Sequence, residues 1–104
     1  MNSILIPGGL GYVGSHTILD IFLHTDFHVL VIDDLSNCSL TVMERVKEIL
    51  GMAGRSNEEI AKRISFQEGS VLDLPFLKTV FEGARIANRP ITTIIHFAAK
   101  KSVP

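Results

Sequence analysis

The sequence has almost no net charge, a single cysteine and no long apolar run. Ten basic and eleven acidic residues leave a formal charge of −1, so the chain lacks the positive field that attracts nucleic acid or an anionic membrane surface. The lone Cys38 excludes an internal disulfide and a cysteine pair for a metal, and this usage fits a reducing compartment. The first apolar run, Ile4 to Ile6, is too short for a signal-peptide core or a membrane span. We therefore expect an untargeted, cytoplasmic binder of small molecules, with no nucleic-acid, membrane or metal partner.

The 104 residues are enough for one small domain, since 46% of them are apolar. A chain of this length buries roughly two thirds of its unfolded surface, which provides one core. The sequence contains no repeats, low-complexity tracts or linkers. We therefore treat residues 1–104 as a single structural unit.

The first third of the chain has a β-α-β pattern. Ser3 to Ile6 and His28 to Ile32 are short apolar runs typical of strands that are buried on both faces. Between them, four residues at spacings i, i+4, i+7 and i+8 form one stripe of a helix: Gly14, Ile18, Ile21 and Phe22. A right-handed crossover makes the two strands parallel and places the helix on one face.

The remaining residues repeat this alternation. A second helical stripe contains Val42, Val46, Ile49 and Leu50, and Ser56 with Glu59 has the spacing of a capping box for a short helix that ends at Arg63. A third strand is expected at Ile64 to Glu68. The next helix is expected to begin with Asp73 as N-cap and Pro75 in its first turn, and to bury Phe76, Val80 and Phe81. Gly83 to Pro90 is expected to be a loop, and Thr92 to Ala98 the most apolar strand.

This order predicts an α/β fold of the Rossmann type, a doubly wound parallel sheet of which the chain supplies part. The elements run β-α-β-α-β-α-β, and the expected strand order is 3-2-1-4. In that order the fourth strand lies at an edge of the sheet, where its unpaired backbone groups favour association with another chain.

A glycine-rich turn separates the first strand from the first helix. Gly8, Gly11 and Gly14 have the spacing G-x-x-G-x-x-G. In a dinucleotide-binding turn the first glycine permits the sharp bend, the second lets the backbone approach a pyrophosphate, and the third lets the helix pack closely. The helix N-terminus then offers free N–H groups to the diphosphate. The alternative interpretation is a glycine-rich turn that serves packing alone.

Asp33 ends the second strand, 19 residues after Gly14. At this position a carboxylate can accept hydrogen bonds from both hydroxyls of an adenosine ribose. It would repel a 2′-phosphate, and no arginine lies between Val29 and Met43. The sequence therefore predicts NAD rather than NADP as the cofactor, although Asp33, and still more Asp34, could also serve only to cap a turn.

Three segments carry a family resemblance: GGLGYVGSHT, VIDDLSNCS and HFAAKKSV. They resemble the cofactor-binding half of extended short-chain dehydrogenase/reductases, and among these they are most similar to the UDP-glucose 4-epimerases. The resemblance covers essentially the whole chain but only the opening portion of such an enzyme. It implies that residues 1–104 are the N-terminal half of an NAD-binding domain, without the substrate domain.

The resemblance also implies a set of cofactor-binding residues. Tyr12 and Val13 would lie against the pyrophosphate, Asp34 to Cys38 along the adenosine, and Ser70 with Val71 beside the adenine. The segment after the fourth strand would pass the nicotinamide ribose. The full set is Gly8, Gly9, Gly11, Tyr12, Val13, Gly14, Asp33, Asp34, Leu35, Ser36, Asn37, Cys38, Ser70, Val71, Phe97, Ala98, Ala99 and Lys101. Two departures weaken the match, because Ser70 stands where the family usually has Asp and Pro7 where it often has Thr.

The chemistry that the resemblance implies needs a Tyr-x-x-x-Lys pair, which removes the proton of the sugar 4-OH while hydride passes to NAD. The only tyrosine is Tyr12, and the residue four positions later is His16. We therefore expect no catalytic residue and no epimerase activity in this chain. In the complete enzyme, UDP-galactose and UDP-glucose would interconvert through a 4-keto sugar, and that enzyme could be a homodimer. Two alternatives stay open: part of another extended reductase, such as a sugar-nucleotide dehydratase or decarboxylase, and a free-standing, non-catalytic dinucleotide-binding module.

Overall fold

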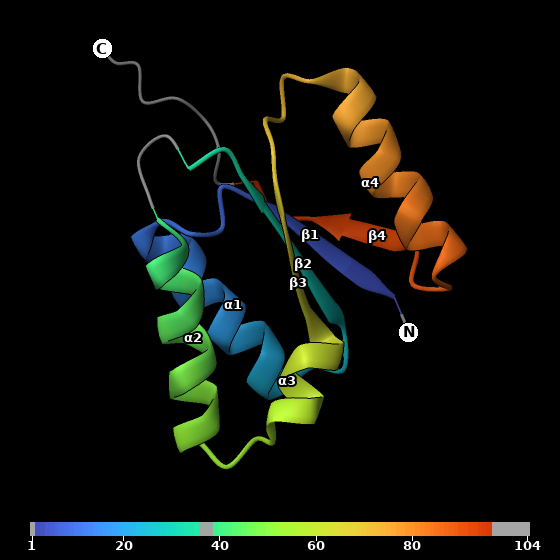
Figure 1. Ribbon diagram of the computed structural model, residues 1–104. Coiled ribbons are helices and arrows are strands. Elements are labelled where there is room, and N and C mark those ends of the chain that lie inside the picture. Colours follow the sequence, from blue (N-terminus) through green and yellow to red (C-terminus); the bar gives the residue numbers. More distant parts are fainter. Residues whose placement is uncertain (1, 36–38, 97–104) are drawn as a thin grey trace.

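The computed structural model describes residues 2–35 and 39–96, with Tyr12 described by its backbone alone. Strands and helices alternate along this part of the chain (Figure 1). The elements are β1 (Ser3–Pro7), α1 (Tyr12–His24), β2 (His28–Asp33), α2 (Leu40–Met52), α3 (Asn57–Arg63), β3 (Ile64–Glu68), α4 (Leu74–Ile86) and β4 (Ile91–Ile94). Within these residues no helix is both long enough and apolar enough to cross a membrane.

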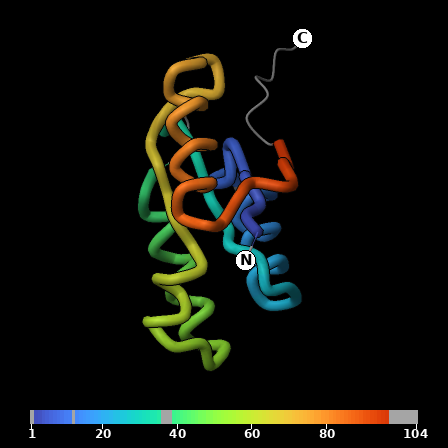
Figure 2. Tube along the Cα trace, turned by 90° about the vertical axis from the view of Figure 1, so that its right-hand side faces the viewer, coloured from blue at the N-terminus to red at the C-terminus, as the bar shows by residue number. Residues whose placement is uncertain are grey.

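The four strands form one parallel sheet in the order β3-β2-β1-β4, which confirms the predicted fold class and strand order. In Figure 2 the strands follow one another in this order, from yellow β3 to red β4. The register pairs Pro7 with Ile32 and Asp33 with Glu68. The carboxyl ends of β1, β2 and β3 therefore meet at one edge of the sheet, where ligands of open α/β sheets bind.

Helices cover both faces of the sheet, but unequally. α1, α2 and α3 lie on one face and α4 on the other (Figure 1). The larger core joins β1 and β2 to the first three helices and includes Phe22, Val31 and Leu50, whereas the smaller core under α4 includes Leu5, Ile32 and Val80. This two-sided burial explains the continuous apolar runs Ile4 to Ile6 in β1 and Val29 to Ile32 in β2.

The predicted caps are present. The Ser56 side chain accepts the N–H of Glu59 at the start of α3, and Asp73 accepts the N–H of Phe76 at the start of α4. Each side chain satisfies a backbone donor that has no partner within its helix. Capping depends on residues three positions apart, and for this reason it could be predicted from the sequence.

Four predictions of local structure were wrong in part. Phe81 of α4, expected to be buried with Phe76 and Val80, is 40% exposed. The buried stripe of α2 is Met43, Val46 and Leu50, and Ile49 is exposed. Gly83 lies inside α4, which continues to Ile86, so the predicted loop is shorter than expected. The last strand, β4, spans Ile91–Ile94 and is mostly exposed. The expected strand ran from Thr92 to Ala98, and its positions 97 and 98 lie outside the described residues. Thr93 pairs with Ile4 of the larger core and Ile94 pairs with Leu5 of the smaller core, so the described helices leave β4 exposed on both faces.

Arg63, at the end of α3, holds the carboxyl end of α1. Its guanidinium is buried and donates to the carbonyl oxygens of Phe22 (3.1 Å), Thr25 (2.6 Å) and Phe27 (3.0 and 3.2 Å). It also lies over the Phe22 ring, 4.2 Å from the centroid, where a cation is attracted by the π face. The guanidinium thus satisfies carbonyls that the end of a helix and its loop leave without partners.

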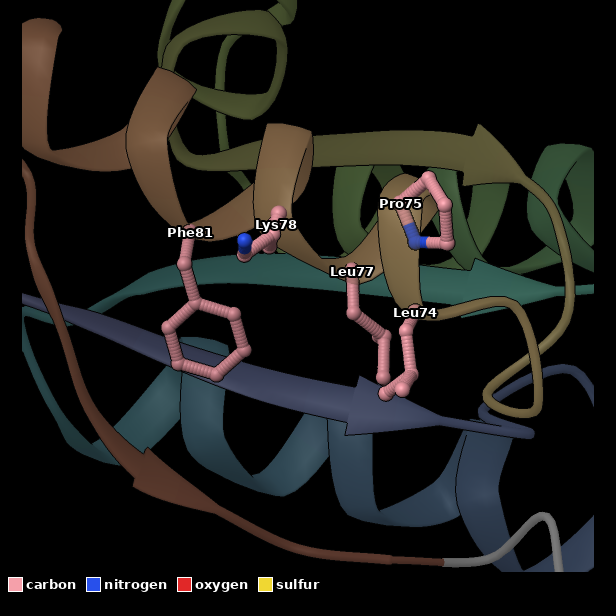
Figure 3. A pocket seen from close by; sticks show the side chains of 5 residues that line it. All are labelled: Leu74, Pro75, Leu77, Lys78 and Phe81. Carbon is pink, nitrogen blue, oxygen red and sulfur yellow. The ribbon is translucent and has the colours of Figure 1, made fainter.

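The face beneath α4 is open toward the β4 edge. Leu5 is the register partner of Ile94, so Ile94 lies on the same face as α4, and it is 51% exposed. An apolar groove runs along α4, and in Figure 3 three of its lining side chains, Leu74, Leu77 and Phe81, extend from the helix toward β1 and β4. β4 pairs with β1 on one side only, within the described residues. An unpaired edge beside an apolar groove favours association between chains.

Replacing Arg63 tests the link between α3 and α1. Arg63→Met keeps an apolar stem over Phe22 but removes every donor, so one buried carbonyl, of Phe22, and two partly buried ones, of Thr25 and Phe27, lose this partner. We expect a loss of about 2 to 4 kcal/mol in the free energy of unfolding, measured by urea denaturation. Arg45→Met, on the exposed side of α2, is the control and should change stability little. Equal stability of the two variants would contradict this role.

Replacing Ile94 tests the open edge. We expect the chain to self-associate as its concentration rises, and Ile94→Lys to reduce this association, because a charged edge strand resists pairing. Light scattering between about 10 and 200 μM, spanning the range where partly exposed edges aggregate, is the measurement. A wild-type chain that stays monomeric throughout this range would show that the edge is already protected.

Candidate functional site

The turn after β1 lies at the carboxyl edge of the sheet. Gly8 has a φ of 74°, a conformation that disfavours any side chain, and its N–H donates to the carbonyl of Ile32 at 2.7 Å. The sharp bend predicted for the first glycine is therefore present. It directs the chain from β1 across the end of β2 and into α1.

Gly9 and Gly14 bring α1 close to this turn. A Cβ atom on Gly14 would lie 2.8 Å from the Cα and carbonyl oxygen of Gly9, and a Cβ on Gly9 would lie 3.0 Å from side-chain atoms of Ile6 and Val31. Backbone meets backbone at Gly14, so no rotamer change could make room for a side chain there. The close packing predicted for the third glycine of the motif is thus present.

Gly11 differs from its neighbours because the fold does not require a glycine at this position. It is the N-cap of α1, with a φ of −75°, and a Cβ there would contact only the Gly8 carbonyl oxygen at 3.8 Å. The N-cap makes no side-chain hydrogen bond, and the first turn of α1 has no acidic residue. An open backbone at a helix N-terminus fits the close approach of an anionic group such as a diphosphate.

Asp33 lies at the end of β2 and is 9% exposed. Its Oδ2 accepts the N–H of Leu10 at 3.3 Å, and its Oδ1 accepts the N–H of Leu35 at 2.8 Å. The carboxylate thus connects the glycine-rich turn to the segment after β2. Since each carboxylate oxygen has two lone pairs, one on each oxygen is not used by these two bonds.

Ser70 and Val71 follow β3 at the same edge. The Ser70 hydroxyl accepts the N–H of Leu72 at 3.0 Å, and Val71 packs against the smaller core. Gly69, just before them, lies under Phe76, since a Cβ there would be 2.4 Å from the Phe76 ring. The hydroxyl of Ser70 keeps its own hydrogen for donation, whereas a carboxylate at this position could only accept.

The structure places part of the predicted set. Gly8, Gly9 and Gly11 lie in the turn before α1, whereas Gly14 and Val13 lie in the first turn of α1, where Val13 is 59% exposed. Asp34 is exposed and has an interaction partner. Seven predicted residues lie outside the described part of the chain: Ser36, Asn37, Cys38, Phe97, Ala98, Ala99 and Lys101.

One buried polar cluster was missed by the sequence reasoning. The His28 imidazole has Nδ1 3.1 Å from the Lys62 carbonyl and 3.0 Å from the Arg89 guanidinium, while Nε2 is 3.0 Å from the Ser65 hydroxyl. Burial and the charge of Arg89 lower the pKa of His28, so the ring is neutral near pH 7. His28 begins β2, at the edge opposite to the glycine turn. Among the described residues, no three His, Cys, Asp or Glu side chains gather as metal ligands.

The chain is similar to known proteins along nearly its whole length. The family described as GDP-mannose 4,6 dehydratase matches residues 5–104. The UDP-glucose 4-epimerases of Haemophilus influenzae and Bacillus subtilis are 39% and 38% identical to it over 101 residues, which is 97% of this chain and 25% of each relative. The chain therefore spans about a quarter of the length of these relatives.

Two solved structures extend the comparison. The UDP-Glc/GlcNAc 4-epimerase from Campylobacter jejuni superposes with a TM-score of 0.72 at 32% identity, over 99% of this chain and 26% of that one. A UDP-glucose-4-epimerase from Stenotrophomonas maltophila, with bound NAD and formylated UDP-arabinopyranose, has a TM-score of 0.75 at 27% identity and the same coverage.

Two glycine variants separate packing from binding. Gly14→Ala places a Cβ against the Gly9 backbone and should lower the free energy of unfolding by about 1 to 3 kcal/mol. Gly11→Val should change stability by about 1 kcal/mol at most, as an N-cap substitution does. It should nevertheless weaken binding of ADP about tenfold or more, because the branched side chain fills the approach to the helix N-terminus.

Urea denaturation and calorimetric titration of ADP measure the two effects. Gly51→Val, at the end of α2 with open space around its Cβ, is the matched control and should leave ADP binding unchanged. Unchanged ADP affinity in Gly11→Val would mean that the turn serves packing alone.

Proposed function

The chain belongs to the family described as GDP-mannose 4,6 dehydratase, of the extended short-chain dehydrogenase/reductase type, and we propose that it is the N-terminal, NAD-binding part of a UDP-glucose 4-epimerase. The observation that carries the proposal is the open backbone at Gly11, which the fold does not need and an approaching diphosphate does. The epimerase relatives, at 33–39% identity over nearly the whole chain, support the choice of enzyme.

The residues present at the carboxyl edge fit such a cofactor. The diphosphate would be held by the turn from Gly8 to Gly11 and by the N–H groups of Tyr12, Val13 and Gly14 that begin α1. The adenosine ribose would bond to Asp33, and the adenine would lie beside Ser70 and Val71. The adenosine side would also be bordered by Asp34 to Cys38, and the nicotinamide ribose by Phe97, Ala98, Ala99 and Lys101.

The charge of the same edge favours NAD over NADP. Asp33 and its register partner Glu68 bring two carboxylates to adjacent strand ends, where a 2′-phosphate would add its own negative charge. No arginine between Val29 and Met43 offers a compensating cation. NAD, when bound in the complete enzyme, would accept a hydride from C4 of the sugar and return it. The part played by residues 1–104 is to bind and orient that cofactor.

Proton transfer to and from the sugar hydroxyl would come from residues beyond this chain, since the sequence has no Tyr-x-x-x-Lys pair. In this proposal residues 1–104 are the N-terminal half of the cofactor domain, and a UDP-sugar is a partner of the complete, cytoplasmic enzyme only. A sugar-nucleotide dehydratase is the second candidate, favoured by the description of the matching family. The coding sequence after Pro104 decides between them.

Cofactor preference tests the role of Asp33. We expect the chain to bind NAD more tightly than NADP, and Asp33→Ala to weaken NAD by about 1 to 3 kcal/mol, the usual cost of losing a charged hydrogen-bond partner. Asp33→Asn removes the charge but keeps the shape of the side chain, so it should reduce the difference between the affinities for NAD and for NADP. Calorimetric titration of both dinucleotides into each variant is the measurement, and equal affinities in the wild-type chain would refute the assignment.

A further inference from the structure

Leu35 has an unusual backbone for a residue of its kind. Its φ is 61°, in the left-handed region that leucine rarely adopts. A glycine would adopt this conformation without strain, whereas at leucine the strain is offset by the surrounding structure. The side chain is partly buried and packs against the larger core.

The backbone of Leu35 contacts the candidate cofactor site. Its N–H donates to Oδ1 of Asp33 at 2.8 Å, while Oδ2 of the same carboxylate accepts the N–H of Leu10 at 3.3 Å. The two donors come from separate segments, one from the segment after β2 and the other from the glycine-rich turn. Together they restrict rotation of the carboxylate about its side-chain bonds.

This arrangement matches a vicinal diol. Each oxygen of Asp33 has one lone pair that these two bonds leave unused, and a ribose offers two adjacent hydroxyl donors. An acceptor that is already oriented loses less conformational freedom on binding. A freely rotating carboxylate would have to be ordered by the ligand itself.

We propose that Leu35 is a positioning residue for the ribose-binding carboxylate. Its side chain, packed on the core, holds the backbone at positive φ, and its N–H thereby fixes Oδ1 of Asp33 for the ribose diol. The inference rests on the proposed function, because it takes Asp33 as the ribose acceptor. Leu35 acts through the position of its backbone N–H, and its packed side chain maintains that position.

Two adenine nucleotides test the proposal: ADP and 2′,3′-dideoxy-ADP, which lacks the diol. Leu35→Ala removes the contact with the core and should weaken ADP about fivefold to tenfold, in the range of one lost hydrogen bond. The affinity for 2′,3′-dideoxy-ADP should stay the same. Leu35→Met restores an apolar side chain of similar volume and should restore ADP affinity. Met52→Ala, at the exposed end of α2, is the control and should change neither affinity.

The amide of residue 35 provides a second readout that needs no nucleotide. In the wild-type chain its hydrogen exchange should be slowed by the bond to Asp33, and in Leu35→Ala and in Asp33→Ala this protection should be lost. Unchanged protection in Leu35→Ala, or an equal loss of affinity for both nucleotides, would overturn the proposal. If the wild-type chain binds neither nucleotide, the proposed function fails, and the exchange measurement still decides whether Leu35 fixes the carboxylate.

Discussion

The candidate site depends on how closely α1 approaches the turn that precedes it. Gly14 meets the backbone of Gly9 at a distance where even a methyl group would collide, so the helix begins directly on the turn. This contact places the open backbone of Gly11 at the carboxyl edge and brings the N–H of Leu10 within reach of Asp33. A larger residue at position 14 would displace α1. The open backbone of Gly11 and the N–H of Leu10 would then be displaced as well. Helix packing and ligand approach therefore depend on the same few glycines, although each glycine serves a different purpose.

Asp33 connects two backbone segments in this chain, and this structural role is compatible with its proposed role as an acceptor for the ribose hydroxyls. A carboxylate with little exposure is stable only when it is hydrogen bonded. Asp33 meets this condition with two backbone N–H groups from separate segments. The same two bonds also orient the carboxylate oxygens of Asp33. The bonds that stabilise the buried carboxylate therefore also hold it in place for a ligand. A cap of a turn and an acceptor for a ribose are thus compatible functions of one side chain.

The two faces of the sheet show how burial depends on layers. β1 and β2 have helices on both faces, whereas Thr92, Thr93 and Ile94 of β4 are exposed within the described chain. Ile94 is a residue type that favours a buried strand, yet it is 51% exposed. The composition of a segment indicates whether it is stable when buried, and the elements packed beside it decide whether it is in fact buried.

The sequence by itself determined the order of strands and helices, the glycine spacing and the caps of α3 and α4. These features depend on residues that are close in the chain, where periodicity and turn chemistry act directly. The sequence predicted that Val46 and Leu50 of α2 face the core, but it could not decide between Met43 and Ile49, because both are apolar and the packing of α1 against α2 selects between them. Nor could it show the positive φ of Leu35 or the bond from Leu10 to Asp33, which spans 23 residues. Those were decided by the tertiary structure, because they exist only once the glycine turn, the end of β2 and the larger core have packed together.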